Sequence, residues 1–297
     1  MRVGITGASG LIGSALVTHL RSGEHDVVPI VRRSPTGDEI RWDPSGAGID
    51  SNLLVGLDAI VNLAGAGIGD KRWTEDYKQE ILNSRVVGTT TIAEAMAGCP
   101  DGPQVLLSGS AIGIYGDRDD QVLDEQSAAA DDFLAGVCKA WEAATLAASN
   151  AGVRVVHLRT GIVLSPDGGA LKKMLPLFKL GAGGRFGSGK QWMSWITLHD
   201  EVRAIEHLLT SSLRGPVNLT APNPVTNRDF AQGLGKTLHR PSLFPVPGFG
   251  PKLLLGQELA DSLLFASQRV APTALRNDGF TFDHPELGAA LQAILDS

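Results

Sequence analysis

A glycine-rich turn near the start of the chain reads Thr6-Gly7-Ala8-Ser9-Gly10-Leu11-Ile12-Gly13. The residues before it, Arg2–Thr6, predict a strand, and Leu11–Ser22 predicts a helix. In this setting Gly7 permits a tight turn, Gly10 lets a pyrophosphate approach the backbone, and Gly13 lets helix and strand pack closely. Free amides at the start of the helix would face the phosphates. We therefore expect a dinucleotide to bind through Gly7, Ser9, Gly10, Leu11, Ile12 and Gly13.

The spacing of these glycines is G-x-x-G-x-x-G, which differs from the G-x-G-x-x-G of the standard dinucleotide-binding turn. A plain glycine-rich turn is the alternative. The strand before the turn and the helix after it favour the dinucleotide interpretation.

Short apolar runs alternate with longer amphipathic stretches through the first half of the chain. This alternation predicts strand-helix-strand units, and therefore an α/β fold with a Rossmann-type, doubly wound parallel sheet. The predicted strands are Arg2–Thr6, Asp26–Val31, Ile40–Trp42, Ala59–Leu63, Val105–Ser108 and Arg154–Arg159. The predicted helices are Leu11–Ser22, Glu75–Met96 and Phe133–Ala151.

The residues after the second predicted strand indicate which dinucleotide binds. An NAD site usually carries an acidic residue about 20 residues beyond the turn, where it binds the ribose 2′-hydroxyl. This chain has Arg32 and Arg33 there. Two guanidinium groups can bind a 2′-phosphate in bidentate fashion, so we expect the cofactor to be NADP(H). An ordinary solvated loop is the alternative.

The pattern changes near residue 165, where glycine- and proline-rich connections join shorter elements. We expect an NADP-binding Rossmann domain over residues 1–165 and a smaller substrate-binding lobe over residues 166–297. Residues 195–220 are expected to return to the first domain, because Pro216–Leu219 reads as a strand that can join its sheet. In the second lobe, the tryptophans of the segment from Gly187 to Trp195 predict either a substrate platform or core packing.

The composition excludes several classes of function. Lys and Arg number 26 against 32 Asp and Glu, so the net charge is −6 and the chain lacks the positive surplus that nucleic-acid binding requires. Cys99 and Cys138 are too few for a disulfide framework and form no metal-binding spacing. No run approaches the roughly 18 uninterrupted apolar residues of a membrane span, and the N-terminus leaves no room for a leader. We therefore expect a cytoplasmic monomer or homodimer with no metal, no membrane contact and a small-molecule substrate.

Several separated motifs resemble those of the extended short-chain dehydrogenase/reductases, which include sugar-nucleotide epimerases. They are Thr6-Gly7-x-x-Gly10-x-x-Gly13, Asn62-Leu63-Ala64-Gly65, Ser108-x-Ser110, Tyr115-Gly116, Arg159-Thr160-Gly161 and Trp195-Ile196-x-x-x-Asp200. A second set is similar to that of an atypical NADP-binding subfamily, the epimerase family proteins: Arg41-Trp42-Asp43-Pro44, Asn83-Ser84-Arg85, Trp141-Glu142-Ala143-Ala144, Gly187-Ser188-Gly189 and His284-Pro285-Glu286-Leu287. The resemblance spans essentially the whole chain.

The family's usual catalytic pattern is only partly present. That pattern combines Ser or Thr with Tyr-x-x-x-Lys on one helix, where the ammonium lowers the pKa of the phenol. If Glu142 is matched to the family's acidic residue, Leu134 stands at the tyrosine position and Cys138 at the lysine position. A shift of one residue gives Ala135 and Lys139 instead. Neither alignment supplies a tyrosine, so standard catalysis is not expected.

A partial set of catalytic candidates remains. Ser110 lies just beyond the fifth predicted strand, at the carboxyl edge of the sheet, and resembles the family's serine that binds a substrate hydroxyl. Tyr115 is either a displaced proton donor or a residue that lines the pocket. Cys138 is expected to be a small buried side chain that touches the cofactor, and Lys139 a solvated residue.

Further cofactor contacts are expected where the fourth and fifth strands end. The small residues Leu63, Ala64 and Gly65 would let the ribose and diphosphate lie against backbone, and Ser108 ends the fifth predicted strand. The resemblance places Arg85 near a cofactor-touching position, where it can balance phosphate charge while Glu80 accepts a hydrogen bond from a ribose hydroxyl. The alternative for both is an ion-bearing helix face.

Two functions remain open. The first is an NADP(H)-dependent oxidoreductase or epimerase-like enzyme acting on a small polar or nucleotide-linked substrate. The second is a non-catalytic NADP(H)-binding redox sensor or regulatory protein. Ser110 and the second lobe favour the enzyme, whereas the missing tyrosine favours the sensor.

Overall fold

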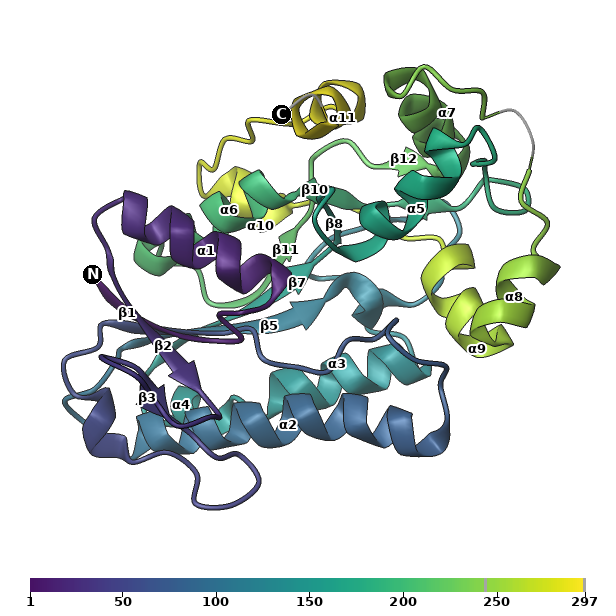
Figure 1. Ribbon diagram of the computed structural model, residues 1–297. Coiled ribbons are helices and arrows are strands. Elements are labelled where there is room, and N and C mark those ends of the chain that lie inside the picture. The colour runs from purple at the N-terminus through teal and green to yellow at the C-terminus, as the bar shows by residue number, and fades with distance from the viewer. Residues whose placement is uncertain (243–244, 296–297) are drawn as a thin grey trace.

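The computed structural model describes residues 1–242 and 245–295 and is built around one parallel sheet (Figure 1). Its seven strands have the spatial order β11-β7-β5-β4-β1-β2-β3. In chain order they are β1 (Arg2–Thr6), β2 (Asp26–Val31), β3 (Ile40–Arg41), β4 (Ala59–Asn62), β5 (Val105–Ala111), β7 (Arg154–Thr160) and β11 (Gly215–Leu219). Every neighbouring pair is parallel, which confirms the predicted Rossmann-type α/β fold.

Helices cover both faces of the sheet (Figure 1). One face carries α1 (Leu11–Ser22) and α6 (Leu198–Thr210), and the other carries α2 (Glu75–Ala97), α3 (Phe133–Ala143) and α4 (Leu146–Asn150). Because alternate residues of a strand point to opposite faces, each central strand supplies both cores. The buried side chains of β5 follow this rule, since Leu107 packs with the α1 core and Leu106 with the α2 core.

Several predicted elements have the bounds that the sequence indicates. The first strand, the first helix and the second strand coincide with β1, α1 and β2 residue for residue. The strand expected at Pro216–Leu219 is present as β11 and pairs with β7. The division into two domains at residue 165 stays a prediction.

Two predicted elements differ from the structure by more than one residue. The helix expected over Phe133–Ala151 is divided, because the hydroxyl of Thr145 donates to the carbonyl of Glu142 at 2.7 Å and lies 3.0 Å from His157 of β7. Strand β5 is longer than expected, since its pairing with β7 continues to Ala111. Ser110 therefore lies within the strand and not beyond it.

A separate hydrophobic cluster, formed mostly by elements that follow β7, lies beside the sheet. It contains Trp195, Phe230 and Leu171, all at most 1% exposed. Among the described residues, no helix combines the length and apolar character needed to cross a membrane. The other described α-helices and strands are β6 (Val122–Leu123), β8 (Ile162–Leu164), α5 (Gly169–Lys179), β9 (Trp192–Met193), β10 (Trp195–Thr197), β12 (Val225–Thr226), α7 (Asn227–Thr237), α8 (Phe249–Leu255), α9 (Gln257–Ala260), β13 (Arg269–Val270), α10 (Thr273–Asn277) and α11 (Leu287–Leu295).

Candidate functional site

The glycine turn joins β1 to α1. At two of its three glycines, neighbouring backbone leaves no space for a side chain. Gly7 has a φ of +66°, and a Cβ there would lie 2.8 Å from the carbonyl group of Leu63. A Cβ at Gly13 would overlap the carbonyl oxygen of Gly7. A Cβ at Gly10 would have one heavy-atom neighbour within 4 Å in the described structure, the oxygen of Gly7 at 3.3 Å. The turn is therefore open at Gly10, where the sequence predicts a pyrophosphate.

Thr6, at the end of β1, fixes the loop that follows β4. Its hydroxyl donates to Oδ1 of Asn62 at 2.6 Å and accepts from the amides of Leu63 and Ala64 at 3.1 and 3.3 Å. The amide of the Asn62 side chain donates in turn to Thr89 of α2 at 2.8 Å. The small-residue loop is thus held against the glycine turn at the carboxyl edge of the sheet.

Arg32 and Arg33 are both exposed but differ in their partners. The guanidinium of Arg33 donates to both carboxylate oxygens of Glu39, at 2.6 and 2.7 Å. This contact, together with a backbone hydrogen bond from Thr36, holds the pKa of Glu39 down at about 2. Arg32 has no hydrogen-bond or ion-pair partner within residues 1–242 and 245–295. Of the two, Arg32 is the arginine whose charge is not already paired.

Helix α2 separates the two residues that the sequence grouped together. Glu80 is exposed and lies 3.6 Å from the ammonium of Lys71. Arg85 is only 7% exposed, and its Nη1 donates to the carbonyls of Ala66 and Ile81 at 2.9 and 3.1 Å. The expected joint role of Glu80 and Arg85 is therefore not favoured, because only Arg85 faces the loop after β4.

On helix α3 the two alternative lysine positions, Cys138 and Lys139, differ in burial. Leu134 and Cys138 are buried, whereas Lys139 is exposed and lies 3.0 Å from Asp131. The thiol of Cys138 contacts the carbonyl of Ala111 at 3.7 Å. Burial raises the pKa of this thiol to about 12, so Cys138 stays uncharged. The inward face of α3 thus carries neither a phenol nor an ammonium at the positions where the family has Tyr and Lys.

Ser110 is buried and belongs to an ion-pair cluster. It is 5% exposed, and its hydroxyl donates to Oε1 of Glu142 at 2.7 Å. Arg159 donates to both oxygens of the same carboxylate, at 2.8 and 3.0 Å. Burial opposes ionisation of Glu142, but the contacts with Arg159 and Ser110 still hold its pKa below the usual range. Ser108 is also fully buried, and its hydroxyl has no partner in the described part of the chain.

Tyr115 is fully buried as well. Its hydroxyl donates to Oδ1 of Asn218 at 2.7 Å and accepts from Arg159 at 3.0 Å. Burial raises the pKa of the phenol. The interpretation of Tyr115 as a displaced proton donor is not supported by this placement, since both functions of the hydroxyl are already used inside the protein.

The two tryptophans of the segment from Gly187 to Trp195 have different surroundings. Trp195 is fully buried, and its Nε1 donates to the carbonyl of Asn223 at 3.2 Å. The guanidinium of Arg269 lies 4.2 Å from the ring centre of the half-buried Trp192. Core packing is therefore the correct interpretation of Trp195, and only Trp192 can contribute to a platform.

Two buried carboxylates were not predicted as functional. The first is Glu142, which pairs with Arg159. Both residues occur in motifs that resemble the family, but nothing in the sequence predicts that they are in contact. Glu201, in the first turn of α6, is fully buried and accepts a hydrogen bond from Thr160 at 2.9 Å. Its Oε2 has no partner among the described residues, and burial raises its pKa to about 8. The sequence does not reveal the burial of Glu201, because glutamate is also common on the exposed face of an amphipathic helix.

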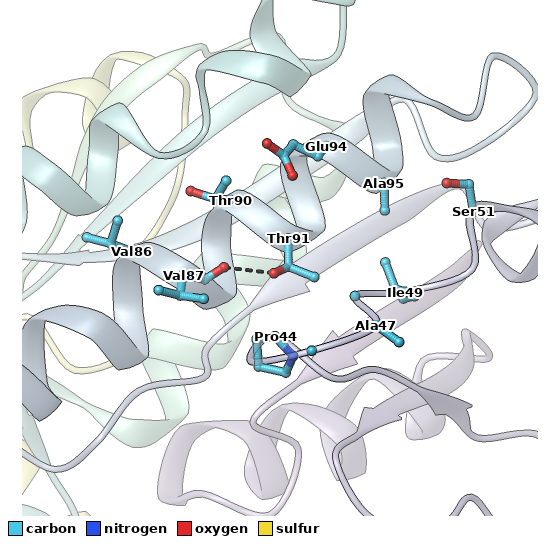
Figure 2. Close-up of a pocket in the computed structure, with 12 residues that line it drawn as sticks. Pro44, Ala47, Ile49, Ser51, Val86, Val87, Thr90, Thr91, Glu94 and Ala95 are labelled. Atoms are coloured by element: carbon cyan, nitrogen blue, oxygen red, sulfur yellow. Dashed lines mark hydrogen bonds between the residues drawn. The ribbon is translucent and has the colours of Figure 1, made fainter.

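An open groove of about 620 Å³ lies elsewhere, on the outer side of α2. Figure 2 shows that the loop from Pro44 to Ser51 forms one wall and α2 the other, with Val87, Thr91 and Glu94 among the lining side chains. Val87, Thr91 and Glu94 lie on a different face of α2 from Thr89, which contacts Asn62 beneath the glycine turn. The groove is distinct from the candidate cofactor site.

The parallel sheet and the glycine turn after β1 define a Rossmann-type protein. Residues 3–219 match the NAD dependent epimerase/dehydratase family, and residues 246–294 match a domain of unknown function, DUF1731. The chain belongs to the NAD dependent epimerase/dehydratase family. The resemblance identified from the sequence motifs is confirmed.

Three similar proteins illustrate the relationship. An epimerase family protein of Mycobacterium bovis, Mb2239, is 45% identical over 97% of this chain and 96% of its own length. The crystal structure of human epimerase family protein SDR39U1 with NADPH is 34% identical, covers 100% of both chains and superposes with a TM-score of 0.93. The nucleoside-diphosphate sugar epimerase from Corynebacterium glutamicum is 40% identical, with a TM-score of 0.81 over 99% of this chain and 58% of that one.

Proposed function

We propose that this chain is an NADP(H)-binding oxidoreductase or epimerase-like enzyme whose cofactor crosses the carboxyl edge of the main sheet. The observation that carries the proposal is the glycine turn, which is closed by backbone at Gly7 and Gly13 and open at Gly10. This is the shape that a pyrophosphate needs at the start of a helix. The NADPH in the human SDR39U1 structure supports the choice of cofactor.

The proposed cofactor contacts follow the carboxyl edge of the sheet. The amides from Gly7 to Gly13 would bind the pyrophosphate, and the loop from Leu63 to Gly65 would lie beside the ribose. Arg32 would bind the 2′-phosphate, because its guanidinium is not engaged by a carboxylate in the described structure. Ser108 and Cys138 are buried beneath this edge, where we propose that they form its floor.

The bound cofactor supplies a hydride to a substrate carbonyl or accepts one from an alcohol. We propose that the substrate is small and polar or nucleotide-linked, and that it lies between the β5 edge and the second lobe. The Ser110 hydroxyl donates its hydrogen bond to Oε1 of Glu142, at 2.7 Å. Ser110 could therefore act toward a substrate only as a hydrogen-bond acceptor, which would suit a hydroxyl better than a carbonyl.

A non-catalytic NADP(H)-binding sensor is the second candidate. It is supported by the inward face of α3, which carries Leu134 and Cys138, and by the exposure of Lys139. It is also supported by the enclosed hydroxyl of Tyr115. On this hypothesis the second lobe would report cofactor binding to a partner.

One experiment separates these functions. NADPH absorbance is followed across carbonyl compounds and nucleotide sugars, with Gly10→Val as a control that should not bind cofactor. Turnover by the unmodified protein but not by the control would support the enzyme. Tight NADPH binding without any turnover would support the sensor, and a folded protein that binds no NADPH would refute both. We also propose a cytoplasmic monomer or homodimer, which fractionation and light scattering would test.

A further inference from the structure

Among the described residues, Arg85 is a buried cation without an anionic partner. Its side chain is 7% exposed, and within residues 1–242 and 245–295 no carboxylate lies within ion-pair distance of it. Its Nη1 donates to the carbonyls of Ala66 and Ile81, while its Nε has no hydrogen-bond partner there. Burying a charge without a counter-charge is costly. A buried, unpaired charge at the edge of the proposed cofactor site is a candidate functional group.

The position of Arg85 lies between the carboxyl ends of β4 and β5. A Cβ at Gly65, in the loop after β4, would lie 3.2 Å from its Cζ. Its guanidinium is 5.0 Å from the ring centre of Trp141 on α3. One turn earlier on α3, Cys138 contacts Ala111 at the end of β5. Arg85 therefore faces the space that the loop after β4, the end of β5 and α3 enclose.

The path of a dinucleotide across this edge determines which part of it would meet Arg85. The pyrophosphate is expected at the start of α1, and the adenosine half on the β2 side, where Arg32 stands. The nicotinamide half then lies on the opposite side, over β4 and β5. Arg85 is accordingly on the nicotinamide side of the site.

The family pattern described above places a cation in this region, from the lysine of Tyr-x-x-x-Lys. Here the inward residue at the lysine position is Cys138, which is uncharged. The positive charge comes instead from α2, on the other side of the same space. Arg85 thus restores the charge that α3 does not provide.

We propose that Arg85 places a positive potential beside the nicotinamide ring and thereby makes the site select NADPH over NADP⁺. The inference rests on the proposed cofactor site. The two forms of the cofactor carry the same phosphates and riboses and differ by one positive charge, which is on the nicotinamide ring of NADP⁺. Attraction between Arg85 and the phosphates therefore cancels in the comparison, and repulsion from the ring remains. Within a poorly solvated site this repulsion is weakly screened.

The selection has a functional consequence. A site that holds the reduced cofactor more tightly is loaded with NADPH, which favours reduction of a substrate. If the protein is a sensor, the same selectivity makes it respond to the reduced form of the pool.

The test compares the affinities of NADPH and NADP⁺ by titration calorimetry. The variants are Arg85→Gln and Arg85→Met, which remove the charge, and Arg85→Lys, which retains it. Lys139→Gln is the matched control, because it removes an exposed cation from the neighbouring helix α3. We expect the unmodified protein to bind NADPH about tenfold or more tightly than NADP⁺. The ratio should fall toward one in both neutral variants and persist in Arg85→Lys and Lys139→Gln.

Three outcomes are distinct. Equal losses of both affinities in Arg85→Gln and Arg85→Met, with an unchanged ratio, would overturn the inference and leave Arg85 as a support for the loop at Ala66. A ratio near one in the unmodified protein would overturn it as well. Failure of the folded, unmodified protein to bind either form would instead refute the proposed function. Arg85→Met keeps an apolar stem over Trp141, so it provides the measurement if Arg85→Gln does not fold.

Discussion

Arg159 of β7 and Glu142 of α3 form a two-point ion pair beneath the carboxyl edge of the sheet, with N–O distances of 2.8 and 3.0 Å. Their side chains are 9% and 13% exposed. Glu142 also accepts a hydrogen bond from Ser110, and Arg159 donates one to Tyr115. The ion pair thus connects β5, β7 and α3. A buried pair of this kind need not stabilise the fold more than an apolar replacement would, but removing one member leaves the other charge uncompensated.

Loss of the Glu142 charge is therefore expected to destabilise the protein strongly. For Glu142→Gln we expect the free energy of unfolding to fall by about 3 kcal/mol, since the guanidinium of Arg159 would remain buried without its carboxylate. Urea unfolding followed by circular dichroism measures this change. The control is Asp131→Asn, which breaks the exposed pair with Lys139 and should leave the unfolding midpoint nearly unchanged. Similar midpoints for the two variants would contradict the prediction.

Glu201 should make stability depend on pH in the opposite sense from most carboxylates. In the unfolded chain it loses its proton near pH 4.5, whereas burial raises its folded pKa to about 8. Between these values unfolding releases a proton, so rising pH favours the unfolded state. The contribution to stability falls by up to about 1.4 kcal/mol for each pH unit in this window.

The variant Glu201→Gln removes this titration. Compared with the unmodified protein, we expect it to gain stability steadily between pH 5 and pH 8, as measured by urea unfolding at each pH. Glu94→Gln, which changes an exposed glutamate of α2, should show no such trend. A constant difference between Glu201→Gln and the unmodified protein across this range would show that Glu201 is ionised in the folded state.

The parts of the fold that the sequence predicts correctly are those set by neighbouring residues. Strand β1, the glycine turn and α1 are recognisable because apolar periodicity and glycine spacing act within about 20 residues. The division between α3 and α4 is not recognisable in this way. It depends on Thr145, whose hydroxyl meets His157 of β7, and that contact exists only after the sheet has formed.

The candidate site shows the same limit. The sequence correctly places Gly10 and the loop at Gly65 just beyond strand ends, because that placement depends on neighbouring residues. It does not reveal that the Ser110 hydroxyl is already engaged, because the hydrogen bond goes to a carboxylate 32 residues away in the chain. Nor does it identify the pairing of Arg33 with Glu39, which depends on how the intervening turn folds.

Arg32 and Arg33 should contribute unequally to the preference for NADPH over NADH. Arg32→Ala is expected to reduce NADPH affinity roughly tenfold to a hundredfold and to leave NADH affinity almost unchanged, because only NADPH carries the 2′-phosphate. Arg33→Ala should have a smaller effect, since its guanidinium already binds Glu39. Titration of both cofactors against both variants measures this difference. Equal NADPH and NADH affinities in the unmodified protein would refute the role of these arginines.

Substitutions in the glycine turn test where the pyrophosphate lies, because a substitution at Gly10 should affect cofactor binding and one at Gly13 should affect stability. A side chain at Gly10 meets little protein, so Gly10→Val should fold and yet lose NADPH binding, as its branched side chain would fill the space of the pyrophosphate. A side chain at Gly13 would overlap the backbone of Gly7, so Gly13→Ala should lower the free energy of unfolding before any cofactor is added.

Both variants are measured by thermal unfolding without cofactor and by NADPH titration. The unmodified protein should gain thermal stability as NADPH is added, because the ligand binds only the folded state. Gly10→Val should lose less cofactor-free thermal stability than Gly13→Ala, and it should show no gain with NADPH. If NADPH instead stabilises Gly10→Val to the same extent as the unmodified protein, the phosphates must bind away from this turn. Gly13→Ala would then remain a measure of how tightly β1 and α1 pack, since its effect arises from backbone contact alone.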